Sequence, residues 1–153
     1  MHIIVSAIGK LKKKSPEYEL MGAYLKRSKW SVEMKEYEEK RALSGEALKT
    51  AEADLLLSGV PKKAKVVVLD EHGETLSSRQ FAGKLRAWQN NGTDTVAFLI
   101  GGADGHGKSV KERADLILSF GRMTLPHFLM RVVLTEQIYR AQTILNGHPY
   151  HRD

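Results

Sequence analysis

Apolar residues recur along this chain in two alternating patterns, one typical of strands and the other typical of helices. Runs rich in β-branched residues, bounded by glycine, proline or charged residues, predict the strands. We expect these strands over residues 2–8, 31–37, 65–70, 95–100 and 116–120. The second of them carries charged residues between its apolar ones, which favours a position near the edge of a sheet.

Apolar residues at helical spacing separate the strands. We expect helices from Pro16 to about Lys29, from Ser44 to near Gly59, over 77–90, briefly after Ser109, and from about Phe128 to Asn146. Ser77 with Gln80, and Ser109 with Glu112, have the spacing of a capping box. Gly147 is expected to cap the last helix, because glycine readily adopts the left-handed conformation found there.

Strands and helices therefore alternate through nearly the whole chain, which predicts an α/β fold with a mainly parallel sheet covered by helices. A length of 153 residues, with no visible linker or repeat, indicates a single domain over 1–153. Ligand sites in such sheets lie beyond the carboxyl ends of the strands. The loops after Leu69, after Ile100 and after Phe120 hold most of the unusual residues, so we expect them to wall a pocket.

The last helix has apolar residues around more than half of its circumference, so a second face must be buried against something. A dimer interface is one explanation, and a helix central to the core is the other. Arg131, Glu136 and Arg140 lie along the same helix. They are either solvated charges or groups that project into a site.

Composition narrows the function classes. The 24 basic and 18 acidic residues leave a net charge of +6, which suits a polyanionic partner and also ordinary solubility. The absence of cysteine excludes disulfides, thiolate catalysis and zinc ribbons, and is compatible with a reducing cytoplasm. No secretory signal or apolar run of membrane-spanning length is visible, so we expect no membrane partner.

Basic residues concentrate between residues 10 and 29, where two acids accompany seven bases: Lys10, Lys12, Lys13, Lys14, Lys26, Arg27 and Lys29. We predict that this basic patch contacts RNA phosphates. A solvated surface without a partner is the alternative.

Four glycines gather in Gly101-Gly-Ala-Asp-Gly-His-Gly107, and they allow a backbone to approach a ligand closely. The stretch from Gly102 to Ser109 satisfies the bare string of a phosphate-binding P-loop, in which Lys108 and Ser109 would hold a nucleotide. Such loops usually follow an early strand, and no later strand ends in a magnesium-binding Asp. A turn without a ligand is a further alternative.

The chain closes with His148-Pro-Tyr-His-Arg-Asp153. Imidazoles titrate near neutrality and arginine pairs with phosphate, so this composition suits acid–base chemistry on a nucleic acid. A solvated terminus is the ordinary alternative.

Four motifs carry a resemblance to a known family: Leu99-Ile-Gly-Gly-Ala-Asp-Gly105, Met123-Thr-Leu-Pro-His127, Arg131-Val-Val-Leu-Thr-Glu-Gln-Ile-Tyr-Arg-Ala141 and His148-Pro-Tyr-His-Arg152. In this order they resemble the pseudouridine N3-methyltransferases of large-subunit (23S) ribosomal RNA, which are of the SPOUT class. The resemblance implies an α/β fold with a C-terminal trefoil knot, a homodimer in the cytoplasm, no metal, and S-adenosylmethionine as methyl donor. Its substrate would be ribosomal RNA or the ribosome, with another RNA or a non-catalytic ribosome-binding role as rivals.

The resemblance also assigns site residues. The cofactor contacts carried over by motif fall on Leu69, Gly102, Gly121, Arg122, Met123, Thr124, Leu125 and Pro126. His151 is the first candidate as base, with Tyr150 and His148 as neighbours, while Arg152 would hold phosphate or the developing charge. The resemblance favours a site shared between two subunits. Ala103-Asp104 and Gly121-Arg122 depart from the residues usual in the family.

Overall fold

The computed structural model describes residues 1–152, and the strands among them form one parallel sheet. The strands are β1 (His2–Ile8), β2 (Ser31–Tyr37), β3 (Lys65–Thr75), β4 (Thr95–Ile100) and β5 (Leu116–Ser119). Their order is β2-β1-β4-β3-β5, and every pairing is parallel. The expected parallel sheet is confirmed, and β2 lies at its edge as its charged residues predict.

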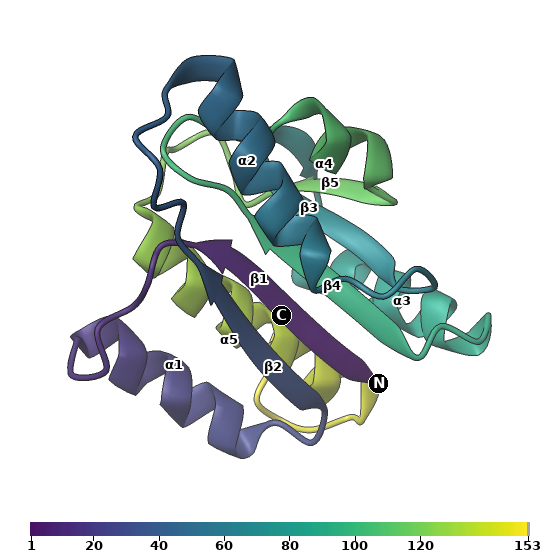
Figure 1. The fold of residues 1–153 in the computed structure, drawn as a ribbon. Helices are drawn as coiled ribbons and strands as arrows, with labels where there is room; N and C mark the ends of the chain where they lie inside the picture. Colours follow the sequence, from purple (N-terminus) through teal and green to yellow (C-terminus); the bar gives the residue numbers. More distant parts are fainter. Residues whose placement is uncertain (153) are drawn as a thin grey trace.

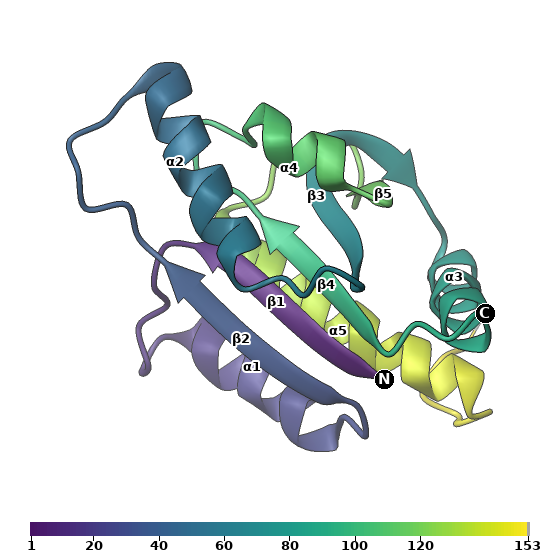
Figure 2. The ribbon, with the colours of Figure 1, turned by 45° about the vertical axis from the view of Figure 1, so that its right-hand side comes forward.

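Helices cover both faces of the sheet. They are α1 (Pro16–Arg27), α2 (Gly45–Ser58), α3 (Ser78–Asn90), α4 (Lys108–Arg113) and α5 (His127–Leu145). α2 and α4 lie on one face, whereas α1, α3 and α5 lie on the other (Figures 1 and 2). The predicted α/β architecture therefore has three layers.

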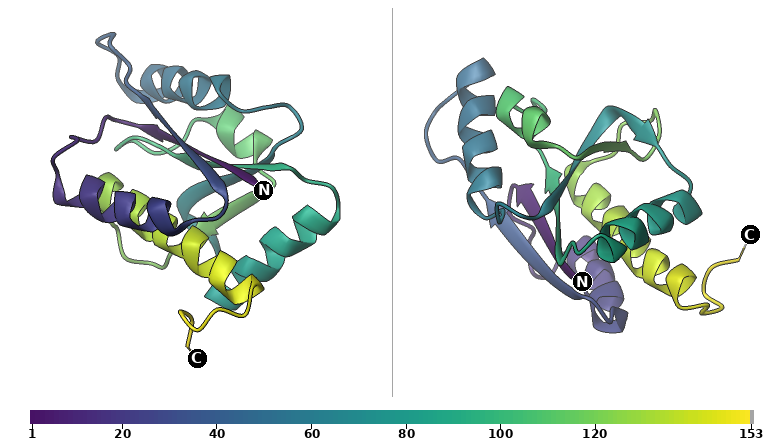
Figure 3. Two further views of the ribbon diagram at one scale, coloured as in Figure 1. Left: turned by 90° about the horizontal axis from the view of Figure 1, so that it is seen from below. Right: turned by 90° about the vertical axis from the view of Figure 1, so that its right-hand side faces the viewer.

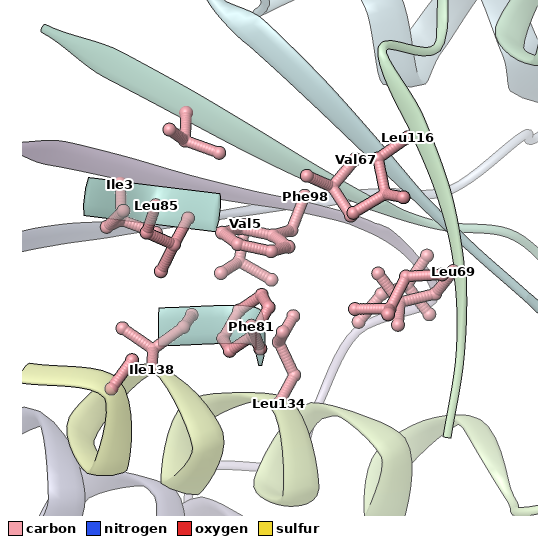
Figure 4. Packing of buried hydrophobic residues seen from close by; sticks show 14 of the residues in the cluster. Ile3, Val5, Val67, Leu69, Phe81, Leu85, Phe98, Leu116, Leu134 and Ile138 are labelled. Atoms are coloured by element: carbon pink, nitrogen blue, oxygen red, sulfur yellow. The ribbon is translucent and has the colours of Figure 1, made fainter. Parts of the chain in front are cut away.

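The alternation of side chains along β3 explains how one sheet holds two helical layers. Val67 and Leu69 join the core beneath α3 and α5, while Val66 and Val68 join the core beneath α2 and α4. Successive residues of a strand point to opposite faces, so an unbroken apolar run is what a sheet covered on both sides requires. Figure 4 shows Phe81 of α3 lying among the strand residues and α5, with its ring centroid 6.0 Å from that of Phe98.

Most of the apolar circumference of α5 is buried within its own chain. Leu134 and Ile138 pack against the sheet, and Val132 packs with Leu11 and Met21 beneath α1. α5 contacts α1 on one side and α3 on the other (Figure 3). A helix central to the core therefore accounts for the buried apolar residues of α5, whereas Phe128 and Leu129 at its start are exposed.

Of the three helix caps predicted from the sequence, those at Ser77 and Gly147 are confirmed and the one at Ser109 is wrong. The capping box of Ser77 and Gln80 is present, but the one predicted for Ser109 is wrong, because α4 begins at Lys108 after Gly107. A Cβ on Gly107 would lie 2.7 Å from the Lys49 carbonyl oxygen of α2, so close packing places a glycine at this helix start. At the end of α5, Asn146 is the C-cap residue, and Gly147 directly after it adopts the predicted left-handed conformation, with φ of +65°.

β3 is longer than predicted. The strand was expected to end at Asp70, but pairing with β5 resumes after a register shift between Leu69 and Glu74. Polar residues fill this bulge, so no apolar pattern announces the second half of the strand. A Cβ on Gly73 would lie 2.6 Å from the Ile117 carbonyl oxygen, which shows how closely the bulge approaches β5.

Candidate active site

The three loops expected to wall a pocket do converge at the carboxyl edge of the sheet. They enclose a cavity of about 400 Å³. Six of the eight predicted cofactor contacts line it: Leu69, Gly102, Gly121, Met123, Thr124 and Leu125. Arg122 and Pro126 are outside this lining; Arg122 is exposed beside the pocket, and Pro126 is the N-cap of α5.

The glycine loop after β4 is a tight turn. The Gly105 amide donates to the Gly102 carbonyl at 3.1 Å, and Gly105 has φ of +83°, which other residues rarely adopt. Gly102 has a close neighbour, because a Cβ there would lie 2.6 Å from Oε2 of Glu52. Only glycine fits at Gly102 without movement of the Glu52 side chain.

Glu52 was missed by sequence reasoning. It lies on α2, is 8% exposed, and its Oε2 has no hydrogen-bond partner among the described residues. Burial, helped by the charges of Asp104 and Glu39, raises the pKa of this carboxyl. A signal was present in the sequence, because Glu52 interrupts the apolar stripe formed by Leu48 and Leu55.

His106 lines the pocket and lies in the glycine loop, but the sequence did not single it out. It is 9% exposed, and Nε2 lies 2.9 Å from the Leu69 carbonyl oxygen. A carbonyl can only accept, so Nε2 carries the proton in this bond. The other nitrogen, Nδ1, is buried without a partner among residues 1–152. Burial lowers the pKa of His106, so the ring is neutral at pH 7.

An ion pair forms the charged wall of the pocket. Nζ of Lys111 lies 3.1 Å from Oδ2 of Asp70, and the His72 amide donates to Oδ1 at 3.0 Å. Burial disfavours the ionised carboxyl, but these two hydrogen bonds outweigh burial and leave the Asp70 pKa below its usual value. The wall is therefore negative at Asp70 and positive at Lys111 at neutral pH.

Lys108 does not take the position that a P-loop requires. Its side chain is 88% exposed and pairs with Glu112 one turn along α4 at 3.5 Å. The P-loop reading of Gly102–Ser109 needs this lysine over the glycine loop. The geometry favours the alternative in which the loop serves a ligand without phosphates.

The C-terminal residues form a second cluster, away from the pocket. The Tyr150 hydroxyl donates to Oε1 of Glu136 at 2.9 Å, and Nη1 of Arg140 lies 3.2 Å from Nδ1 of His151. Nδ1 of His148 accepts the Tyr150 amide at 3.1 Å, and Arg152 is exposed. Within the described chain, none of these four predicted catalytic residues lines the pocket.

α5 separates the two regions. Met130 is the last α5 residue that lines the pocket, whereas the tail contacts Glu136 and Arg140. At 1.5 Å per residue, Met130 and Arg140 are about 15 Å apart along the helix. The turns converge as predicted, but residues 148–152 do not reach them in one chain, because they lie further along α5 (Figure 3).

The basic patch is exposed throughout its seven residues. Arg27 also belongs to the tail cluster, because its guanidinium lies 4.4 Å from the ring centroid of Tyr139 and 5.2 Å from that of Tyr150.

The described residues contain neither a membrane-spanning helix nor a cluster of metal ligands. No helix in residues 1–152 combines the length and apolar character needed to cross a membrane. Nor do three or more His, Asp or Glu side chains of residues 1–152 lie close enough together to hold a metal ion.

With the fold and pocket established, comparison with known proteins assigns the class. The family described as "Predicted SPOUT methyltransferase" matches residues 1–151. The protein named Ribosomal RNA large subunit methyltransferase H from Paramagnetospirillum magneticum is 55% identical over 152 residues, and the match covers 99% of each chain. The protein of the same name from Rhodospirillum centenum is 48% identical, again over 99% of each chain. This chain belongs to the SPOUT methyltransferase family, and within it to the group that contains these relatives.

Proposed function

We propose that this protein transfers a methyl group from S-adenosylmethionine to N3 of a pseudouridine in large-subunit (23S) ribosomal RNA. The observation that carries the proposal is full-length similarity to proteins named as large-subunit ribosomal RNA methyltransferases, at up to 55% identity among those compared. The convergence of three loops on one cavity supports it independently. The resemblance in the C-terminal motifs indicates that the methylated nucleotide is a pseudouridine and that the methylated atom is N3.

The pocket residues fit the proposed cofactor. A cavity of about 400 Å³ is within the range usual for small-molecule sites. Leu69, Ile100 and Leu118 supply apolar walls for an adenine ring, and the glycine loop supplies backbone groups. The carboxylates of Asp70 and Asp104 suit a cationic ligand. When bound, the cofactor supplies a methyl group activated by a sulfonium, and no phosphate needs to be held.

A homodimer would bring the two separate regions together. The tail of one subunit would approach the pocket of the other, where His148, Tyr150, His151 and Arg152 would meet the RNA. Exposed apolar side chains near the pocket end of α1 and α5 support such a contact: Tyr18, Leu20, Met123, Phe128 and Leu129. Met123 is 84% exposed, which is unusual for an apolar side chain that lines a pocket.

The remaining assignments follow the family resemblance. Residues 1–153 form a single domain, although the last of them lies outside the described residues. The loops after β4 and β5 belong to a trefoil knot, which the family resemblance implies. The enzyme acts in the cytoplasm, where ribosomes are assembled.

Methyl transfer to ribosomes that lack the modification tests the function. We expect labelled methyl to appear on one pseudouridine of the large-subunit RNA, with mass spectrometry placing it on N3. Free RNA, isolated subunits and assembled ribosomes should be compared as substrates. Label on a ribose hydroxyl or on another RNA would contradict the proposal, as would binding of ATP with magnesium in preference to S-adenosylmethionine.

A mixed dimer tests the shared site. A chain ending at Asn146 lacks the tail, and a second chain carrying Gly102→Trp has a blocked pocket, so neither homodimer should be active. Mixed dimers should regain activity, because one intact pocket then faces one intact tail. A mixture confirmed to contain heterodimers but showing no activity would count against sharing.

A further inference from the structure

The hydrogen bond between Arg140 and His151 fixes which ring nitrogen of His151 carries the proton. A guanidinium has donors only, so its Nη1 donates and Nδ1 of His151, at 3.2 Å, accepts. An imidazole nitrogen that accepts a hydrogen bond bears no proton. While this bond is kept, Nδ1 bears no proton and a proton on the ring is on Nε2.

Arg140 is held in place by Glu136. Nε and Nη2 of Arg140 donate to Oε1 of Glu136 at 2.9 and 2.6 Å, and the two side chains are 24% and 16% exposed. The hydrogen bond to Glu136 raises the pKa of Arg140, which keeps the guanidinium charged and therefore donating. Nε2 of Gln137 donates to the other Glu136 oxygen at 2.7 Å, so the carboxylate is itself oriented.

The groups around this network do not offer a base either. Burial and the hydrogen bonds with Tyr24 and Glu136 raise the pKa of Tyr150, so its phenol keeps its proton at neutral pH. Its ring packs against Arg140, with the guanidinium carbon 4.8 Å from the ring centroid. From α1, Arg27 adds a second positive charge beside the Tyr150 ring.

We infer that His151 serves the reaction as a hydrogen-bond donor through Nε2, not as the base, and that Arg140 and Glu136 are positioning residues that select this tautomer. The inference rests on the proposed function, since it requires that the tail meets the RNA base and that Nε2, which is buried within one chain, is uncovered there. It replaces the sequence-based assignment of His151 as the base.

The chemistry of the acceptor gives a donor a clear role. N3 of the uracil-like ring lies between two carbonyl groups, so loss of its proton spreads negative charge onto both oxygens. The N3 proton passes to water or hydroxide, and its bonding electron pair stays on the ring. N3 then forms the bond to the methyl carbon, while the electrons of the broken carbon–sulfur bond remain on sulfur. An N–H donated to one carbonyl oxygen stabilises the anion as it forms.

Nitrogen-15 NMR of the imidazole rings in the full-length protein reads the tautomer without any assay of activity. We expect His151 to show an unprotonated Nδ1 and a protonated Nε2 at neutral pH. Arg140→Met should weaken this preference toward that of a free histidine, whereas Arg41→Met, which breaks the distant Arg41–Glu39 ion pair, should leave it intact. His106 is an internal reference, since its bond to the Leu69 carbonyl fixes the same tautomer in every variant. A wild-type His151 with Nδ1 protonated, or with no preference, would overturn the inference.

Single-turnover methyl transfer to ribosomes lacking the modification tests the donor itself. Glutamine places an amide N–H close to the position of Nε2 but takes up no proton, so His151→Gln should be at least about tenfold faster than His151→Ala. The variants should also share the shape of the wild-type pH–rate profile. Equal rates for the two variants, with a break in the wild-type profile that both lose, would establish His151 as the base and refute the donor role. If the wild-type enzyme transfers no methyl, the proposed function fails, and the NMR spectrum alone decides the tautomer.

Discussion

Two arginines of α5 each pair with a glutamate at the same nitrogen–oxygen distance, but the two pairs have different surroundings. Arg131 lies 2.6 Å from Glu36 near the pocket end, and Arg140 lies 2.6 Å from Glu136 near the tail end. The Arg131 side chain is fully buried, and it also donates to the carbonyl oxygens of Ile8 and Gly9 at 2.7 and 2.8 Å. The Arg140 side chain is 24% exposed and contacts the tail.

The difference shows that burial and partners, not the ion pair itself, decide what each arginine does. Arg131 joins α5 to the end of β1 and, through Glu36, to β2. Oε1 of Glu36 also accepts the Leu11 amide at 2.9 Å, so the loop that leaves β1 depends on the same pair. Arg140 joins α5 only to a terminal segment. Arg131 therefore holds the pocket end of α5 against the sheet, whereas Arg140 holds the C-terminal segment against the tail end of α5.

Removal of each arginine should separate these roles most clearly. We expect Arg131→Ala to lower the free energy of unfolding by about 3 kcal/mol, since it empties a buried site, leaves the partly buried Glu36 carboxylate without its ion-pair partner and leaves two carbonyls without their donor. Arg140→Ala should cost about 1 kcal/mol or less, as is usual for partly exposed pairs. Urea denaturation of both variants measures the difference. Equal losses would contradict the comparison.

The sequence predicted the pocket end well because general rules of parallel sheets apply there. Apolar runs identified every strand, and the carboxyl-edge rule located the three loops without any family knowledge. It missed Glu52 and His106, since the partners of each come from a segment distant in sequence. Pairing of His106 with the Leu69 carbonyl spans 37 residues and leaves no periodic pattern.

At the tail end, the sequence showed which residues are present but not how they are arranged. The charges of Glu136 and Arg140 were visible, and their spacing of four residues is typical of an ion pair on a helix. Nothing local indicates that the tail returns to them, because this depends on a turn after Asn146 and on packing of Tyr150 against Tyr139 at 4.9 Å between ring centroids. The distance between tail and pocket needed the three-dimensional structure.

A methyl group added to the glycine loop should damage the pocket end alone. A Cβ on Gly102 would lie 2.6 and 2.9 Å from the two carboxylate oxygens of Glu52, so Gly102→Ala should weaken S-adenosylmethionine binding by about tenfold, or 1.4 kcal/mol. Calorimetry measures the affinity. Adding Glu52→Ala should restore part of it, because the neighbour is then absent.

Gly83→Ala is the matched control, since no atom lies within 4 Å of a Cβ added there. It should leave the affinity unchanged and stabilise α3 slightly. Wild-type affinity in Gly102→Ala would show that the loop adjusts freely, and the tight approach of Glu52 would then have no consequence for the ligand.

Acid should weaken the pocket end through His106. The folded state lowers the pKa of His106, chiefly by burial, while the unfolded chain has the ordinary value of about 6.5. The unfolded state therefore binds more protons below this pH, and stability falls as pH drops from 6.5 toward the folded pKa. Asp70 opposes this shift and Lys111 adds to it.

Urea denaturation between pH 7.5 and 5 measures this loss. His106→Gln keeps an amide N–H for the Leu69 carbonyl but does not titrate, so its stability should fall less with acid than that of the wild type. The difference between the two curves isolates His106 from the other titrating groups. Parallel curves would show that His106 is not a source of the acid sensitivity.

The smallest expected effect concerns the basic patch, which extends from the pocket end to the tail end. Lys12 lies in the loop after β1, at the carboxyl edge of the sheet, and Lys29 lies just beyond α1 near the tail cluster. If RNA spans a pocket and a partner's tail, Lys12→Ala and Lys29→Ala should each reduce the slope of log affinity against log salt by about 0.7. Lys62→Ala removes the same charge from the loop between α2 and β3, outside the basic patch, and should leave the slope unchanged. A smaller slope for Lys12→Ala alone would mean that RNA contacts only the pocket end of the patch. A smaller slope for Lys29→Ala alone would mean that it contacts only the tail end. An unchanged slope in both variants would make the patch a solvated surface.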